Sequence, residues 1–190
     1  MKCIICENFS FSIICKSCQD TTLHTQLDKR ELSKNFFVYS FYSYEQIKDL
    51  INSKYYFYGD RVYKIFANLA FKKFSQNFSF EYPIDIITIN DNNNKEYNQA
   101  AILSKHLRSK TLKPKYNLLE AKNKIKYAGK SLKFRQENPR NFVYKGEKNR
   151  RVILVDDLVT TGSTLLEAKK ILEKNGCDVL FALTLSNAKN

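Results

Sequence analysis

The sequence predicts an α/β fold in which helices cover both faces of a mostly parallel sheet. Three apolar runs, at residues 84–89, 152–157 and 179–185, have the length and the β-branched content of strands. Helical patterns at residues 97–107 and 165–174 separate them. Strands that alternate with helices in this way form parallel sheets that are buried on both sides. Because ligands of such sheets bind at the carboxyl ends of the strands, a functional site is expected there.

The chain begins with two Cys-x-x-Cys pairs that are separated by eight residues. Cys3 and Cys6 form the first pair, and Cys15 and Cys18 form the second. Four thiolates on two tight turns can close a tetrahedron around zinc, which leaves no open coordination position for a substrate. The spacing therefore predicts a structural zinc knuckle. Two disulfides are the alternative, and they would require an oxidising compartment.

Behind the knuckle of residues 1–20, we expect a single larger domain at residues 21–190. The aromatic and β-branched stretch at 36–42 predicts a strand. The apolar spacing at 47–51 and 62–69 predicts two amphipathic helices. We expect the aromatic side chains of this part to fill a core.

The net charge of +13 is concentrated in one segment of the chain. Residues 95–151 hold 17 Lys or Arg against 4 Asp or Glu, whereas the segments before and after them carry net charges of +1 and −1. A local basic field of this kind suits a polyanion or a phosphorylated small molecule.

The N-terminus and the apolar runs argue against export and against membrane insertion. No apolar run approaches the roughly 20 residues that span a bilayer. Glu7 and the cysteine pairs stand where a signal peptide would have an uninterrupted apolar core. We therefore expect a cytoplasmic protein without a transmembrane segment.

The stretch VILVDDLVTTGST carries the strongest functional signal. An apolar strand leads into Asp156 and Asp157, and a turn of small and hydroxyl residues follows before a helix. The turn consists of Thr160, Thr161, Gly162, Ser163 and Thr164. Such a turn offers a phosphate backbone N–H groups, hydroxyls and the positive end of a helix. The two carboxylates would accept hydrogen bonds from ribose hydroxyls and tolerate a nearby Mg²⁺, so the stretch predicts a site for a ribose 5-phosphate group.

A plainer explanation covers part of the same stretch. Thr164 and Glu167 have the spacing of a capping box, and carboxylates are favourable near the positive end of a helix. That explanation does not account for two adjacent acids on an apolar strand or for the preceding Thr-Thr-Gly. We therefore favour the phosphosugar site.

The same stretch resembles the thirteen-residue motif of the type I phosphoribosyltransferases, whose fold binds 5-phosphoribosyl 1-diphosphate (PRPP) with Mg²⁺. Together with the cysteine knuckle, with Asn98 and Gln99, and with KSLKFRQENPRNFVY at residues 130–144, the chain resembles the ComF family of competence proteins. The resemblance covers nearly the whole chain. It implies a type I phosphoribosyltransferase fold, with the acid pair on the ribose hydroxyls and the hydroxyl-rich turn on the 5-phosphate.

Two functions and one plain alternative are open for the basic segment. By the resemblance, a mobile loop in this region would close over the diphosphate of PRPP. The candidates for the diphosphate side are Lys95, Asn98, Gln99, Lys130 and Arg135. The segment would otherwise track a nucleic-acid backbone while aromatic rings stack on bases. The candidates for this contact are Lys122, Lys124, Lys126 and Tyr127. A solvated lysine-rich face is the plain alternative.

The resemblance implies a PRPP-binding protein of natural transformation. Such a protein would handle single-stranded DNA on the cytoplasmic side of the inner membrane, beside other DNA-uptake proteins. A metabolic phosphoribosyltransferase, whose lysine-rich loop serves catalysis alone, is the competing function, and a PRPP-sensing module without chemistry is a third. Thr160 stands where purine-salvage members of the fold carry an aspartate that works as a base, which argues against a purine acceptor.

Overall fold

The computed structural model describes residues 1–89, 98–123 and 132–188. Its central sheet has six strands in the order β1-β2-β8-β7-β3-β4. Neighbouring strands of this sheet run parallel, except that β1 and β2 are antiparallel. The strands are β1 (Asp28–Ser33), β2 (Phe36–Ser43), β8 (Asp178–Asn187), β7 (Arg151–Val159), β3 (Ile84–Thr88) and β4 (Leu112–Lys115). The predicted mostly parallel sheet is therefore confirmed.

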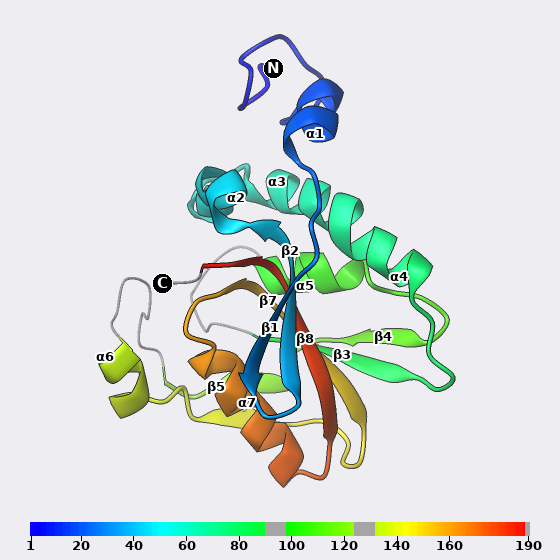
Figure 1. Ribbon diagram of the computed structural model, residues 1–190, viewed down its shortest axis with the longest axis vertical. Helices are drawn as coiled ribbons and strands as arrows, with labels where there is room; N and C mark the ends of the chain where they lie inside the picture. The colour runs from blue at the N-terminus through cyan, green and yellow to red at the C-terminus, as the bar shows by residue number, and fades with distance from the viewer. Residues whose placement is uncertain (90–97, 124–131, 189–190) are drawn as a thin grey trace.

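The sheet separates two apolar clusters, one on each face. Helices lie on both faces of the sheet in Figure 1. Along β7, Ile153 and Val155 belong to the first cluster, whereas Val152 and Leu154 belong to the second. This alternation is the two-residue period of a strand, and it makes β7 apolar on both sides. A strand buried in this way must carry its polar residues at its ends.

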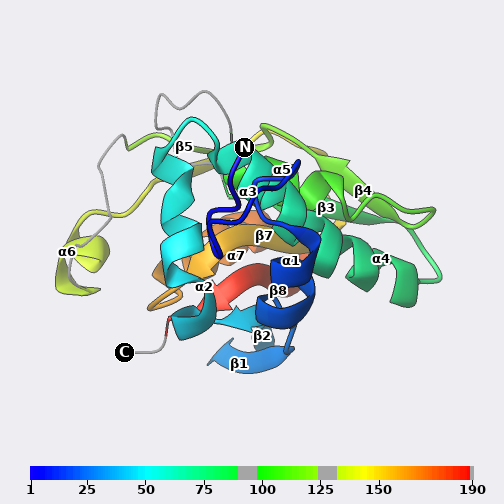
Figure 2. The ribbon, with the colours of Figure 1, turned by 90° about the horizontal axis from the view of Figure 1, so that it is seen from above.

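Helical segments between residues 44 and 105 cover the first cluster (Figure 2). They are α2 (Tyr44–Ile51), the 3-10 turn η1 (Asn52–Tyr55), α3 (Gly59–Phe66), the π-helical stretch η2 (Ala67–Lys72), α4 (Lys73–Asn77) and α5 (Gln99–Lys105). The two predicted amphipathic helices are confirmed, because Ile47 of α2 and Val62 and Phe66 of α3 are buried in this cluster. The chain runs through α3, η2 and α4 without a break.

The second cluster is covered by α7 (Ser163–Lys174) and by a small hairpin. The hairpin consists of β5 (Leu119–Ala121) and β6 (Phe142–Tyr144), which pair antiparallel. Helix α6 (Leu132–Glu137) lies between them in the sequence. Phe142 is buried against α7, so it serves as a core residue. With helices on both faces of the sheet, the predicted layers are confirmed.

The N-terminal knuckle lies beyond the first helix layer, at the top of Figure 1. A bridge between Lys2 and Phe9 and the short helix α1 (Lys16–Thr22) shape it. Cys3 and Ile14 belong to the same apolar cluster as α3. The knuckle thus shares a core with the rest of the chain, and a division at residue 20 stays a prediction.

The sequence does not predict the two edge strands, β1 and β4. Strand β1 alternates between exposed and half-buried residues, and Leu32 is its one large apolar side chain. Strand β4 contains Pro114, which has no N–H to donate and is tolerated at the edge of a sheet. Edge strands need fewer apolar residues because only one neighbour and one face cover them.

The strand that carries the acid pair is longer than predicted. It continues past residue 157 because Leu158 pairs with Ser186 and Val159 pairs with Asn187 of β8. The acid pair therefore lies just before the end of β7. Helix α7 also begins earlier than predicted, at Ser163, so the turn between strand and helix is short.

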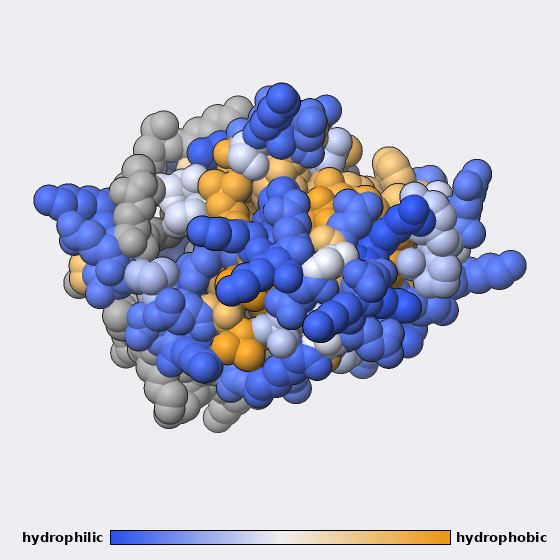
Figure 3. Space-filling view, turned by 90° about the horizontal axis from the view of Figure 1, so that it is seen from below, coloured by the Kyte–Doolittle hydropathy of each residue, from blue (hydrophilic) through white to orange (hydrophobic). Residues whose placement is uncertain are grey.

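The face opposite the knuckle carries mainly hydrophilic residues, and hydrophobic ones show there in separate patches (Figure 3). Within the described ranges, no helix combines the length and the apolar content that a bilayer crossing requires.

Candidate functional site

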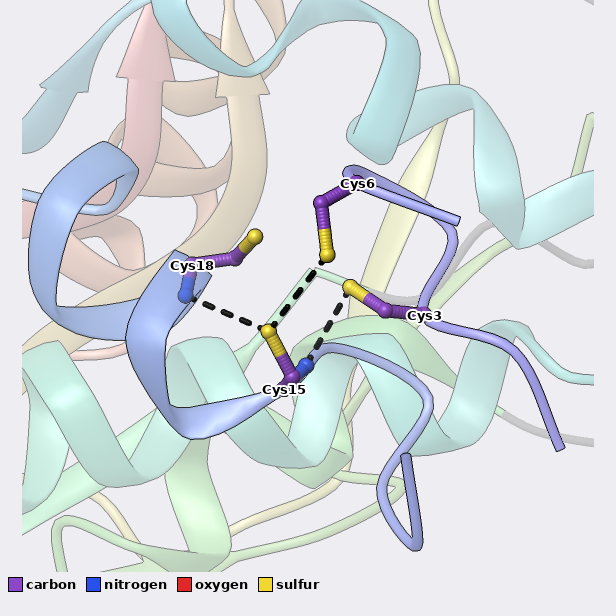
Figure 4. A group of neighbouring side chains, drawn as sticks. All are labelled: Cys3, Cys6, Cys15 and Cys18. Atoms are coloured by element: carbon purple, nitrogen blue, oxygen red, sulfur yellow. Dashed lines mark hydrogen bonds between the residues drawn. The ribbon is translucent and has the colours of Figure 1, made fainter. Parts of the chain in front are cut away.

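The four cysteines of the two pairs converge in the knuckle (Figure 4). Their Sγ atoms all lie within 4.8 Å of one another, and those of Cys6 and Cys15 are 3.7 Å apart. Cys15 is the N-cap of α1 and accepts a hydrogen bond from the N–H of Cys18. The N–H of Cys15 donates to Sγ of Cys3 at 3.3 Å, so the start of the helix holds the second pair against the first.

This donor set fits zinc. A tetrahedral site with Zn–S bonds of about 2.3 Å places its sulfurs about 3.8 Å apart, close to the 3.7 Å between Cys6 and Cys15. Burial alone would raise the pKa of Cys3, but N–H groups of Cys15, Cys6 and Ile5 outweigh burial and lower it to about 6. All five cysteines of the chain are free thiols, and Cys177 is buried in the second apolar cluster, away from the knuckle.

The acid pair lies at the carboxyl end of β7, between two layers of the fold. Oδ2 of Asp157 accepts hydrogen bonds from Lys54 Nζ at 2.8 Å and from the Tyr63 hydroxyl at 3.2 Å. Lys54 belongs to η1 and Tyr63 to α3, so the helix layer of the first cluster fixes this carboxylate. Burial works to lower the pKa of Lys54, but the Asp157 carboxylate outweighs it, and the pKa is raised.

Asp156 has a different environment from its neighbour. Its Oδ1 accepts the N–H of Asp157 at 2.8 Å. Burial, followed by the negative charge of Asp157, raises the pKa of Asp156 to about 7, although Arg140 and Lys54 oppose the shift. Near neutral pH Asp156 is therefore close to its titration point, whereas Asp157 is held by its contacts with Lys54 and Tyr63.

Residues 160–164, for which the sequence predicts a phosphate site, form a turn with one backbone position in the left-handed region that glycine favours. Gly162 has φ of 80°, and a Cβ at this position would lie 2.6 Å from Leu32 Cδ2. The hydroxyls of Thr161 and Ser163 lie 3.0 Å apart. The carbonyl of Thr160 accepts a hydrogen bond from Arg30 Nη1 at 2.6 Å, which ties the turn to edge strand β1.

Helix α7 points its N-terminus at this turn. Gly162 is the N-cap, no side chain caps the helix, and its first turn contains no acidic residue. The positive end of the helix dipole is therefore not opposed by an acid of the first turn. A phosphate at the turn would meet this end of the helix together with the hydroxyls.

The capping-box explanation is wrong. Glu167 reaches across to another segment and accepts the backbone N–H groups of Arg140 at 3.0 Å and Asn141 at 2.7 Å. The hydroxyl of Thr164 accepts a hydrogen bond from Arg140 Nε at 3.2 Å. Because Gly162 precedes the helix, Thr164 already lies inside α7 and cannot cap it.

These contacts place a buried arginine beside the turn. Arg140 is 8% exposed. Burial lowers the pKa of its guanidinium, and the charges of Asp156, Glu167 and Asp157 work against that shift. The acid pair is thus flanked by two cations, Lys54 from the helix layer and Arg140 from the segment before β6.

The structure also places the remaining candidates. Asn98 caps α5, since its Oδ1 accepts the N–H of Ala101 at 2.9 Å. Nε2 of Gln99 is buried and has no hydrogen-bond partner among the described residues. Lys122 is exposed, and its N–H donates to the carbonyl of Asn141 at 3.3 Å, next to Arg140. Lys95, Lys124, Lys126, Tyr127 and Lys130 lie outside the described residues, as does the side chain of Arg135.

Four residues at the site are absent from the sequence prediction: Arg30, Lys54, Tyr63 and Arg140. Three of them, Arg30, Lys54 and Tyr63, come from segments to which the sequence analysis assigns no functional role. Arg140 alone lies in a stretch with a signal, because residues 130–144 carry part of the family resemblance. Most partners of the acid pair are therefore brought to it by tertiary packing, which local sequence patterns do not reveal.

Comparison with known proteins gives matches of two kinds in sequence. Residues 65–189 match the family described as phosphoribosyl transferase domain. Competence protein F of Haemophilus influenzae is 40% identical over 99 residues, which are 48% of this chain and 43% of that protein. The chain thus spans less than half the length of this relative.

The matches among solved structures include two adenine phosphoribosyltransferases. The Trypanosoma brucei enzyme, in complex with AMP, pyrophosphate and ribose-5-phosphate, has a TM-score of 0.45 at 16% identity and covers 86% of this chain and 87% of its own. The Leishmania tarentolae enzyme has a TM-score of 0.44 at 14% identity, with coverage of 84% and 94%.

Proposed function

The chain belongs to the family of phosphoribosyl transferase domains, and on that premise we propose that it binds PRPP with Mg²⁺ at the carboxyl end of β7. Its fold is the type I phosphoribosyltransferase fold, preceded by the four-cysteine knuckle. The proposal rests on one observation, which is that three features lie together at the carboxyl end of β7. They are the acid pair, the hydroxyl-rich turn and the N-terminus of α7.

Each feature suits one part of PRPP. Asp156 and Asp157 offer carboxylate oxygens to the ribose hydroxyls, and residues 160–164 offer hydroxyls and N–H groups to the 5-phosphate. The amide of Gln99, a buried donor without a described partner, suits a diphosphate oxygen. Bound Mg²⁺, for which carboxylate oxygens are suitable neighbours, would neutralise charge on the diphosphate. Zinc on the four cysteines would serve structure alone.

We further infer that the protein acts in competence, in the handling of single-stranded DNA during uptake. The relative named competence protein F supports a competence-related phosphoribosyltransferase-like protein. The net charge of +13 in residues 95–151 supports a polyanionic partner. On this proposal the protein works on the cytoplasmic side of the inner membrane, beside other DNA-uptake proteins.

Two measurements test the proposed function. The first follows PRPP by ³¹P NMR, alone and with candidate acceptors or DNA. The second follows binding of single-stranded DNA against salt, where each lost phosphate contact lowers the log–log slope by about 0.7. Replacing Lys122, Lys124 and Lys126 with Ala should flatten that slope by up to about 2, and Tyr127→Ala should weaken binding without altering the slope. PRPP turnover without DNA binding at about 50 mM salt would instead support the metabolic enzyme.

A further inference from the structure

Three consecutive aromatic rings are exposed on the turn between α2 and α3. Tyr55, Tyr56 and Phe57 have exposed fractions of 60%, 57% and 87%. We call residues 55–58 the aromatic loop. Burying a ring of this kind stabilises a protein by several times the thermal energy, so leaving three adjacent rings in water has a cost that a purely structural turn does not require.

The loop is organised around one anchoring ring. Tyr58 is half-buried and packs against the first apolar cluster. The ring of Tyr56 stacks on it with centroids 5.5 Å apart and planes 3° apart, and Phe57 meets it edge-on at 5.4 Å. Backbone hydrogen bonds from Tyr56 to Ser53 at 2.8 Å and from Gly59 to Tyr56 at 3.0 Å close the turn. Rings held in this way lose little conformational entropy when a ligand stacks on them.

The aromatic loop borders the phosphosugar site. Lys54, the residue directly before it, places its ammonium group 2.8 Å from Oδ2 of Asp157. The side chain of Lys54 is only 18% exposed, so the first residue outside the loop is already part of the site.

The exposure of the rings indicates the chemistry of their ligand. A small acceptor would be bound in a concave pocket that encloses most of its surface. Open aromatic faces next to basic residues are the arrangement that binds single strands of nucleic acid, because every base has a face that stacks. Arg61 is exposed just beyond the loop, while Asp60 is paired with Lys64 at 2.7 Å. Residues 55–64 therefore carry a net charge of +1.

We propose that the aromatic loop is a base-stacking platform, on which a single strand of DNA lies at the rim of the phosphosugar site. This inference rests on the proposed function, because DNA is the partner named there. It adds the place of contact, and it assigns that contact to residues outside the basic segment. Stacking by Tyr56 and Phe57 makes the binding tolerant of sequence.

Fluorescence anisotropy with a labelled oligothymidylate tests the platform. Phe57→Leu and Tyr56→Leu keep an apolar side chain but remove the planar face, and each should weaken binding by roughly 5- to 100-fold. The salt dependence should stay as in the wild type, since no charge is lost. Phe57→Trp should restore binding. Phe11→Leu is the matched control, because Phe11 is 96% exposed on the knuckle, and it should bind as the wild type does.

The outcomes separate this inference from the proposed function. If the wild type binds DNA and both leucine variants bind equally well, the platform is wrong and the DNA partner stands. If the wild type does not bind DNA, both the stacking platform and the DNA partner are wrong. PRPP binding is then tested separately, by the thermal shift that PRPP produces. That shift should be unchanged in the leucine variants, which verifies that the phosphosugar site is still folded.

Discussion

Lys54 Nζ lies 2.8 Å from Oδ2 of Asp157, although the two residues are 103 positions apart in the sequence. Their side chains are 18% and 16% exposed, so water screens the pair only in part. The contact joins the helix layer of the first half of the chain to the carboxyl end of β7. It fixes one carboxylate of the acid pair before any ligand arrives.

A double-mutant cycle measures this contact. Lys54→Met and Asp157→Asn should each lower the free energy of unfolding, because each leaves a polar partner unpaired at a half-buried position. We expect the double variant to be more stable than the sum predicts, with a coupling of about 1–3 kcal/mol by urea unfolding. Strictly additive effects would mean that the ion pair contributes nothing.

The raised pKa of Asp156 predicts a pH dependence with a definite sign. The folded group titrates at about 7 and an unfolded aspartate at about 3.9, so between these values the folded state holds a proton that the unfolded state has lost. The free energy of unfolding should therefore fall as pH rises from about 4 to about 7, by at most about 1.4 kcal/mol per pH unit from this group.

Asp156→Asn removes that titration and provides the reference. Urea unfolding at pH 5, 6, 7 and 8 should show the wild type losing stability relative to the variant up to about pH 7, with little further change above about pH 8. Parallel curves for the two proteins would show that Asp156 titrates normally in the folded state.

The turn should depend on glycine at its left-handed position. Gly162→Ala should destabilise the protein by about 1–2 kcal/mol for backbone conformation alone. The new methyl group would also meet Leu32 Cδ2 at 2.6 Å, so adding Leu32→Ala should recover the steric part and leave the conformational part. If Gly162→Ala leaves both thermal stability and PRPP affinity at wild-type values, the turn is not built as described.

The knuckle should hold one zinc ion per chain. Elemental analysis of purified protein should find near-stoichiometric zinc, and Cys3→Ser should lose it together with thermal stability, because metal binding and folding of such a site are coupled. Cys177→Ala is the matched control, since Cys177 lies in the second apolar cluster and should not affect the zinc content. A zinc-free wild type that unfolds at the same temperature as the zinc-loaded protein would contradict the structural role.

Local patterns predict those parts of the fold whose cause is local. The buried run Val152 to Val155 identifies β7, and the acid pair and its turn follow within the same stretch, so sequence reveals them together. The cysteine spacing likewise predicts the knuckle. Strand β1 is not predicted because the sequence of a polar edge strand resembles that of a loop. Strand β4 is not predicted because Pro114 argues against a strand.

The partners of the acid pair are not predicted from the sequence for another reason. Lys54 and Arg140 reach Asp156 and Asp157 only after η1 and the segment before β6 are packed on opposite sides of the sheet. No local pattern distinguishes Lys54 from the other basic residues of the chain, and Arg140 stands out only because it lies in the stretch 130–144 that carries part of the family resemblance. Glu167 is a similar case. Its spacing from Thr164 indicates a helix cap, but in the folded chain its carboxylate accepts the backbone N–H groups of Arg140 and Asn141.

Calorimetric titration of PRPP with Mg²⁺ into the double variant Asp156→Asn/Asp157→Asn tests the central claim most directly. Both changes keep the shape of the side chains and remove the charged acceptors. The control is Asp178→Asn, an exposed carboxylate at the other end of the same sheet. We expect the wild type and the control to bind one PRPP per chain and the folded double variant to show no measurable binding. PRPP binding by the double variant with wild-type affinity would contradict the assignment of the site.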